Sequence, residues 1–221
     1  MRSVLGILCV VLASALVAAC GGGGDNNSSP ARLRVLHASP DAPNVDVYVD
    51  GSKVLSNVPY PTASAYLTVA AGAHEIKVNA TGTTTTVIDV KPNLASGGAY
   101  TAIAANFVAN IQALLATDET SAAPAGQARV RVIHAAPDAG PVAILVNGAV
   151  VLSNVSFGAI SSYLTLPAGS YNVQVNAAGT SNTAIQATLA VSAGANYSAV
   201  AIGSVKTSPA NPLALKVLTD G

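Results

Sequence analysis

The sequence contains no tryptophan and very little charge. Of its 221 residues, ten are basic and ten are acidic, which makes 9% charged residues. Aromatic residues make up only 4%. An ordinary soluble domain has about 25% charged residues. The formal net charge is zero, which removes the electrostatic reason for binding nucleic acid or an anionic membrane surface. We therefore expect no nucleic-acid partner.

Cysteine is almost absent, and both cysteines lie near the N-terminus. Met1 and Arg2 give a short positive start, and Cys9 lies in an apolar run over residues 4–17. A charged start, an apolar run of about 7–15 residues and a small-residue end are typical of a secretory signal. The run is shorter than the roughly 20 apolar residues of a membrane-spanning helix. Residues 1–19 are therefore predicted to be a signal peptide.

The segment Val-Ala-Ala-Cys that ends at Cys20 resembles the lipobox of bacterial lipoproteins. The resemblance implies that the Cys20 thiol receives diacylglycerol and that the new N-terminus is acylated, for example with palmitate. Residues 20–30 would then be the lipidated cysteine and a glycine-rich flexible tether. Glycine rather than aspartate follows the cysteine, which in Gram-negative lipoproteins implies the outer membrane, on its periplasmic or its surface face. The mature chain would have no thiol and no disulfide.

The rest of the chain is a duplicated domain. Residues 31–80 and 128–177 align without a gap at an offset of 97, so that the segment 31–42 returns as 128–139. Self-similarity at a fixed spacing is the signature of a structural repeat. The sequence predicts a first repeat at 31–118, a linker at 119–127 rich in alanine, and a second repeat at 128–221.

Each repeat has the pattern of short β-strands. Residues 45–50 alternate valine with polar residues, and the pairs Asp50-Gly51 and Asn147-Gly148 are strong hairpin signals. Seven or eight strands in about 95 residues favour an all-β fold of two tandem Ig-like antiparallel β-sandwich domains. Tyr100 and Tyr197 follow glycine-containing turns, in a position that resembles the tyrosine corner of such sandwiches. In the first repeat, the expected strands lie at 45–50, 53–59, 64–70, 84–91, 99–106 and 111–117.

A motif at the end of each first strand carries a family resemblance. The segment His-Ala-Ser-Pro-Asp-Ala-Pro at 37–43, followed by Val-x-Val-x-Val-Asp-Gly, resembles the bacterial domain of unknown function 4397. The second copy departs from it, with Ala136 for Ser39, Gly140 for Pro43 and Ala143 for Asp46. The resemblance implies Ig-like sandwiches in secreted or envelope proteins, often in tandem, and it implies no activity.

The histidine and aspartate of this motif are the main candidates for chemistry. Each histidine is followed four residues later by an aspartate, which would suit a metal site or an acid–base pair. Strand alternation instead places His37 on the apolar face with Leu33 and Val35, and an aspartate in such a turn caps its own backbone. We therefore predict a structural or binding turn, with no metal ligand, cofactor or catalytic residue. It comprises His37, Pro40, Asp41, His134, Pro137 and Asp138.

Two further polar groups are assigned structural roles. His74 shares a face with Ile76 and is replaced by Tyr171 in the second repeat, so we expect a packing residue at the core edge. Asp46 and Asp50 lie on one strand face, but a calcium ion needs about six to eight oxygen ligands. The second repeat offers only alanine and asparagine there, which favours a solvated strand face.

The sequence therefore predicts a non-catalytic, lipid-anchored cell-envelope protein whose tandem sandwiches mediate binding or assembly. The binding surface would be the loop end that carries the Pro-Asp turns. Its partner would be an envelope or extracellular protein or a glycan. For a glycan, Tyr48, Tyr60 and Tyr66 are the available aromatic rings.

Two alternatives remain open. Ala143 and Leu145 make both faces of one strand apolar, which would suit a self-associating structural subunit. The less favoured alternative is a metal-dependent enzyme that uses His37 with Asp41 and His134 with Asp138.

Overall fold

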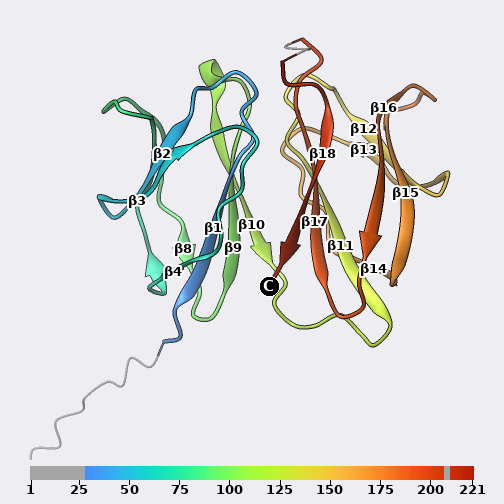
Figure 1. Ribbon diagram of the computed structural model, residues 1–221, viewed down its shortest axis with the longest axis horizontal. Coiled ribbons are helices and arrows are strands. Elements are labelled where there is room, and N and C mark those ends of the chain that lie inside the picture. The colour runs from blue at the N-terminus through green and yellow to red at the C-terminus, as the bar shows by residue number, and fades with distance from the viewer. Residues whose placement is uncertain (1–27, 207–209) are drawn as a thin grey trace, which may run out of the picture.

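The computed structural model describes residues 28–206 and 210–221, and its regular elements are strands apart from one 3-10 helix, η1 (Val108–Asn110) (Figure 1). The predicted signal peptide, Cys20 and most of the predicted tether lie outside the described residues. Across residues 28–206 and 210–221, no helix is both long and apolar enough to cross a membrane.

The first repeat forms a sandwich of two four-stranded sheets. One sheet has the order β10-β9-β1-β4 and the other β3-β2-β6-β7, and a short pair, β5-β8, lies beside them. The strands are β1 (Ala31–His37), β2 (Val45–Val49), β3 (Ser52–Val58), β4 (Leu67–Val69), β5 (Gly72–Ala73), β6 (Ile76–Ala80), β7 (Thr86–Val90), β8 (Asn93–Leu94), β9 (Ala99–Ala105) and β10 (Gln112–Asp118).

The second repeat forms the same sandwich. Its sheets have the orders β14-β11-β17-β18 and β13-β12-β15-β16. The strands are β11 (Gln127–His134), β12 (Val142–Val146), β13 (Ala149–Val155), β14 (Leu164–Pro167), β15 (Gly169–Ala177), β16 (Thr183–Val191), β17 (Asn196–Ile202) and β18 (Ala214–Asp220).

The predicted all-β fold of two tandem sandwiches is confirmed. Strand pairing is antiparallel apart from one parallel pair in each repeat, β1 with β9 and β11 with β17. The parallel pairs place the loops that follow β1 and β9 at the same end of the first sandwich, and the loops that follow β11 and β17 at the same end of the second. The tyrosine corner is also present: the Ala95 N–H donates to the Tyr100 hydroxyl at 2.9 Å, and the Ser192 N–H to the Tyr197 hydroxyl at 3.1 Å.

The two sandwiches pack back to back, so that the molecule has four layers of sheet (Figure 1). The β1 and β11 sheets form the two middle layers and are covered on both faces. Leu36 and Ile133 belong to the hydrophobic cluster of the junction, each fully buried, on the opposite strand face from the cores of the individual sandwiches. Each middle sheet thus contributes to two hydrophobic cores, one within its own repeat and one shared with the other repeat.

Charged groups are buried at the same junction. Arg34 of the first repeat donates to Asp220 of the second at 2.5 Å, and Arg131 of the second repeat donates to Asp118 of the first. The side chains of all four are at most 6% exposed. Each arginine also donates to a main-chain carbonyl of the other repeat. The contacts repeat with approximate two-fold symmetry, so the junction resembles the interface of a symmetric dimer.

A tyrosine from each repeat covers this ionic cluster. The Tyr66 hydroxyl donates to Asp118 at 2.6 Å, and the Arg34 guanidinium lies 4.7 Å from the centre of the Tyr66 ring. Burial, with the hydrogen bond to Asp118, raises the pKa of Tyr66 to about 12. Tyr163 makes the equivalent contact with Asp220, and its pKa is also raised. Tyr66 is therefore committed to the junction, and the expectation that its ring is available to a glycan is wrong.

Candidate functional site

The motif histidine of the first repeat is a buried side chain with both ring nitrogens engaged. His37 is fully buried, and its Nε2 lies 3.0 Å from the Pro43 carbonyl oxygen while its Nδ1 accepts the Ser39 N–H at 3.4 Å. These partners require the neutral ring with the proton on Nε2. Burial lowers the pKa of His37, which keeps the ring neutral. The Tyr60 ring packs against it edge-on.

The second repeat reproduces this arrangement. His134 is fully buried, its Nε2 lies 2.9 Å from the Gly140 carbonyl oxygen, and its Nδ1 accepts the Ala136 N–H at 3.3 Å. Burial lowers the pKa of His134 as well. Within the described residues neither histidine shares a hydrogen bond with the aspartate of its own motif. The structure therefore does not bring together the pairs that a metal site or an acid–base couple would require.

The motif aspartate of the first repeat fixes a neighbouring loop. Asp41 Oδ1 accepts the Val108 N–H at 2.7 Å, and the Ser39 hydroxyl lies 3.4 Å from the same oxygen. Val108 begins η1, which follows β9, and its side chain is 40% exposed. The aspartate thus joins the turn after β1 to the loop after β9 and holds an apolar side chain in solvent.

The motif aspartate of the second repeat does the same with more hydrogen bonds. Asp138 accepts the N–H groups of Val205 and Lys206, each at 2.9 Å, and the Ser204 hydroxyl at 2.8 Å. Burial opposes ionisation of Asp138, but these hydrogen bonds outweigh it and its pKa is lowered. Val205 is 56% exposed and occupies the position equivalent to Val108 at the repeat offset of 97. Each motif therefore presents one exposed valine.

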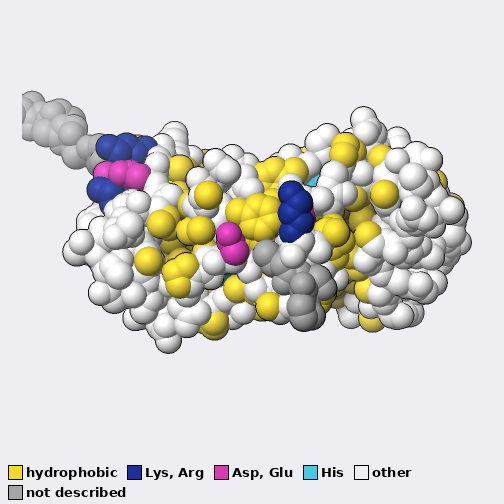
Figure 2. Space-filling view, turned by 90° about the horizontal axis from the view of Figure 1, so that it is seen from above, with side chains coloured by type: hydrophobic (Ala, Val, Ile, Leu, Met, Phe, Trp, Pro, Cys, Tyr) yellow, Lys and Arg dark blue, Asp and Glu magenta, His cyan; other side chains and the backbone are white. Residues whose placement is uncertain are grey.

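These two valines lie at the same end of the molecule, which we call the loop end and define by residues 38–44, 106–111, 135–141, 203–206 and 210–213. Figure 2 views this end directly and shows hydrophobic side chains gathered over the junction of the two sandwiches. The loops of the two repeats touch there, because Asn211 Nδ2 donates to the Pro40 carbonyl at 2.6 Å. The described chain begins at Ser28, at the opposite end of the first sandwich (Figure 1).

His74 lies apart from the loop end and is part of an ion pair. Its Nδ1 lies 2.6 Å from Asp50 Oδ2 and its Nε2 lies 2.8 Å from the Ala70 carbonyl oxygen. The hydrogen bond to Asp50 raises the pKa of His74, although burial opposes it. The expected position at the core edge agrees with its 8% exposure, but a charged partner holds the ring there.

Asp46 is buried, so the expectation of a solvated strand face is wrong at this residue. It is 1% exposed and accepts hydrogen bonds from the Lys53 ammonium at 2.7 Å and the Asn57 N–H at 2.8 Å. Lys53, followed by the Asn57 N–H, lowers the pKa of Asp46 strongly. Across residues 28–206 and 210–221, no three His, Cys, Asp or Glu side chains are grouped to hold a metal ion.

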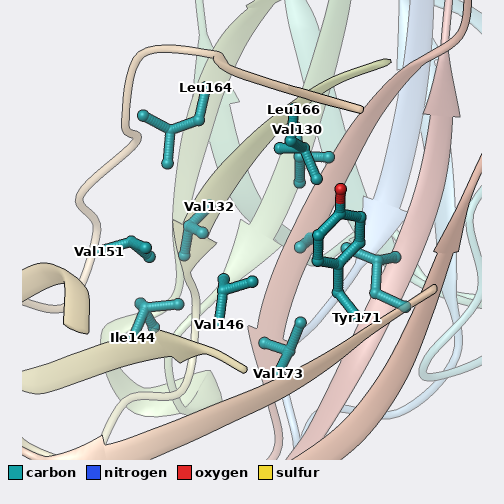
Figure 3. Close-up of a pocket in the computed structure, with 11 residues that line it drawn as sticks. Val130, Val132, Ile144, Val146, Val151, Leu164, Leu166, Tyr171 and Val173 are labelled. Atoms are coloured by element: carbon teal, nitrogen blue, oxygen red, sulfur yellow. The ribbon is translucent and has the colours of Figure 1, made fainter. Parts of the chain in front are cut away.

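An apolar cavity lies between the two sheets of the second sandwich (Figure 3). Val151 and Leu164 stand at one side of it and Tyr171 at the other, and its volume is about 40 Å³. Because a cavity of about 150 Å³ is the size that holds a benzene molecule, one of about 40 Å³ has no room for an organic substrate. Its lining is almost entirely aliphatic, and the Tyr171 hydroxyl is already bonded to the Pro167 carbonyl. We therefore interpret it as a packing gap in the core.

The sequence motif predicts the turn but not the valines that the turn presents. Val108 and Val205 lie outside the segment that aligns without a gap, and isolated exposed valines carry no motif. One signal was available: the offset of 97 relates the two valines as it relates the two aspartates. Only the hydrogen bonds from their N–H groups to these aspartates join them to the motif.

Comparison with known proteins identifies a family and also finds solved structures with a distant similarity. The family model described as a domain of unknown function (DUF4397) matches residues 31–145 and again 130–221. No match was found among curated proteins.

The structural similarities are weak. One is a streptococcal virulence factor whose description is alpha-glucan binding, with 12% identity, a TM-score of 0.24, and coverage of 72% of this chain and 88% of that one. Another is a leucine-rich repeat protein from Bacteroides thetaiotaomicron, with 13% identity, a TM-score of 0.19, and coverage of 80% of this chain and 26% of that one. TM-scores this low support no argument about function.

Proposed function

The chain belongs to the DUF4397 family, and we propose that it is a non-catalytic, lipid-anchored envelope protein that binds a partner through the loop end. One observation carries the proposal. The aspartate of each repeat holds an exposed valine, Val108 or Val205, at the same end of a two-domain body. The two side chains, one from each repeat at the same end of the body, are the proposed parts of one binding surface that neither repeat has alone.

The junction between the repeats supports this proposal, because a divided binding surface must be rigid to bind with little loss of entropy. The shared hydrophobic core and the buried ionic cluster fix the two sandwiches to each other. The loops on each side of the surface are thereby held at a constant separation. Loops displayed on a rigid sandwich are a common solution for recognition.

The direction of the chain determines which end of the body the proposed anchor would hold toward the membrane. The described residues enter the first sandwich at the end opposite the loop end, where the Ser29 carbonyl accepts the Gly97 N–H at 3.1 Å. A lipid on Cys20 would therefore hold that end toward the membrane and direct the loop end away from it. The partner would be an envelope or extracellular protein or a glycan, and an apolar surface favours a protein.

The binding surface is tested by site-specific photo-crosslinking in intact cells. A photoreactive residue is placed at Val108 or Val205, with Val150 as the matched control because it is an exposed valine (60%) on the outer sheet, in β13. We expect adducts with the same partner from both loop-end positions and none from the control. The absence of an adduct at the loop end, or the same adducts from all three positions, would overturn the assignment.

The anchor is tested separately by metabolic labelling with palmitate. We expect the wild-type chain to be labelled and a Cys20→Ala chain to be unlabelled and released from the membrane fraction. A labelled Cys20→Ala chain, or an unlabelled wild type, would reject Cys20 as the lipid carrier.

A further inference from the structure

The outer sheets of the two sandwiches, β3-β2-β6-β7 and β13-β12-β15-β16, differ in the number of charged residues that they carry. The outer sheet of the first repeat carries Asp46, Lys53, Lys77 and Asp89 on its strands. The equivalent strands of the second repeat contain no charged residue. In Figure 2 the second lobe shows no Lys, Arg, Asp or Glu side chains beyond the junction. Two copies of this surface can therefore approach without electrostatic repulsion.

The difference is sharpest at one edge strand. β7 in the first repeat spans five residues, contains Asp89, and is followed directly by Lys91 and Pro92. Charge, lysine and proline at a strand edge are the features by which proteins prevent edge-to-edge pairing. The free edge of the first sandwich is thus protected.

β16 occupies the same place in the second repeat and lacks each of these features. It spans nine residues, and Gln186, Thr188 and Leu189 stand where the first repeat has Asp89, Lys91 and Pro92. The positions are matched through the strand pairing. Ile76 and Val173 are equivalent at the repeat offset of 97, and they pair with Val90 and Ala187, respectively. An uncharged and long edge strand without proline is a template for another strand.

The regular part of this edge is long enough for a stable ladder. The register between β15 and β16 is unbroken from Ile185 to Val191. The side chains of Gln186, Thr188 and Ala190 are exposed on the outer face. On the neighbouring β18, Val217 is 38% exposed, which leaves apolar surface beside the free edge.

We propose that β16 pairs with β16 of a second copy of this chain, antiparallel, about a two-fold axis perpendicular to the outer sheet. Pairing centred on Thr188 places Gln186 of each copy opposite Ala190 of the other. Both sandwiches keep their inner faces on their own cores, and the two outer sheets become one continuous sheet of eight strands, four from each copy. The second copy fits this edge because the same neutral residues meet on both sides of the axis. The proposal is independent of the loop end and of the anchor.

The experiment is cysteine cross-linking of the full chain in the cells that make it. A Thr188→Cys chain is treated with a short thiol-specific cross-linker. The parent chain, whose only cysteines are Cys9 and Cys20, gives the background. Asn172→Cys is the matched control, because Asn172 pairs with Thr188 on the same sheet face but lies on β15, one strand inward. We expect a covalent dimer from Thr188→Cys above background and none from the control.

A lysine on β16 restores the protection found in the first repeat. A chain that carries both Gln186→Cys and Ala190→Cys is compared with the same chain that also carries Thr188→Lys. We expect the chain without the lysine to form the cross-linked dimer and the lysine to abolish it. All three positions are exposed, so these changes leave the core intact. The proposal is overturned if Thr188→Cys gives no dimer, if Asn172→Cys gives as much, if the lysine has no effect, or if the adduct contains only a different protein.

Discussion

Arg34 and Asp220 are 186 residues apart in the sequence and form a buried ion pair at 2.5 Å between the two sandwiches. Together with the pair of Arg131 and Asp118, it joins the repeats through charges whose side chains are at most 6% exposed. Removing one member of a buried pair leaves the other charged and desolvated, which is more costly than losing an exposed pair.

We therefore predict that Arg34→Met lowers the free energy of unfolding by about 3–5 kcal/mol. Arg32→Met is the matched control, because Arg32 lies on the same face of β1 and has no ion pair among the described residues. Its cost should be smaller, about 1 kcal/mol, because Arg32 is half-buried and its guanidinium contacts only the Tyr66 ring, at 5.3 Å from the ring centre. Urea unfolding of both variants measures the difference, and equal losses would contradict the role of the ion pair.

The three histidines should titrate in two classes. Burial lowers the pKa of His37 and of His134, whereas Asp50 raises the pKa of His74. Proton NMR of the ring signals, with His74→Gln to assign one of them, measures each pKa. A pKa at or above 6.5, the ordinary value, for His37 or His134 would contradict the neutral buried ring.

The same shifts predict opposite effects of pH on stability. The folded pKa of His37 and His134 lies below the unfolded value, so their contribution is complete above about pH 6.5 and is lost as the pH falls toward the folded pKa. The folded pKa of His74 lies above the unfolded value, so its contribution is complete below about pH 6.5 and is lost as the pH rises through the folded pKa. In an Asp50→Asn variant we expect only the second dependence to disappear from a pH series of urea unfolding curves.

Removal of the motif aspartates should release the loops that they hold. Asp138→Ala removes the acceptor of two N–H groups and a hydroxyl, and we expect a loss of about 1.5–3 kcal/mol, the scale of hydrogen bonds to a charged group. Asp41→Ala should cost less, because Asp41 accepts one N–H and one longer hydroxyl contact. Hydrogen exchange at the Val108 and Val205 amides should rise in the matching variant only. Unchanged exchange would show that the aspartates do not hold these loops.

Alanine substitutions at two glycines distinguish the cost of backbone strain from the cost of a steric clash. Gly203 and Gly148 both have a positive φ, of 91° and 83°. A Cβ at Gly203 would collide with the Pro212 carbonyl oxygen, whereas one at Gly148 meets nothing within 4 Å. We expect Gly148→Ala to cost about 1–2 kcal/mol from the left-handed backbone alone, and Gly203→Ala to cost clearly more. Thermal unfolding measures both, and equal costs would contradict the close approach of the chain at Pro212.

The sequence by itself determined the duplication, the strand pattern, the Asp-Gly and Asn-Gly hairpins and the position of His37 on an apolar strand face. All of these depend on neighbours within a few residues or on the comparison of one repeat with the other. The alternation of β1 also separated Arg34 from Leu33 and Val35, but it could not tell that the arginine face is buried.

Only the tertiary structure decided that burial, because a strand pattern shows two faces and does not show what covers each of them. The same limit applies to the loop end, where Val108 and Asp41 meet across 67 residues. It applies again to β16, because its uncharged sequence does not show whether the edge of this strand is covered or free. Packing of one sheet on another decides which faces and edges reach the solvent, and that packing depends on contacts between residues far apart in the chain.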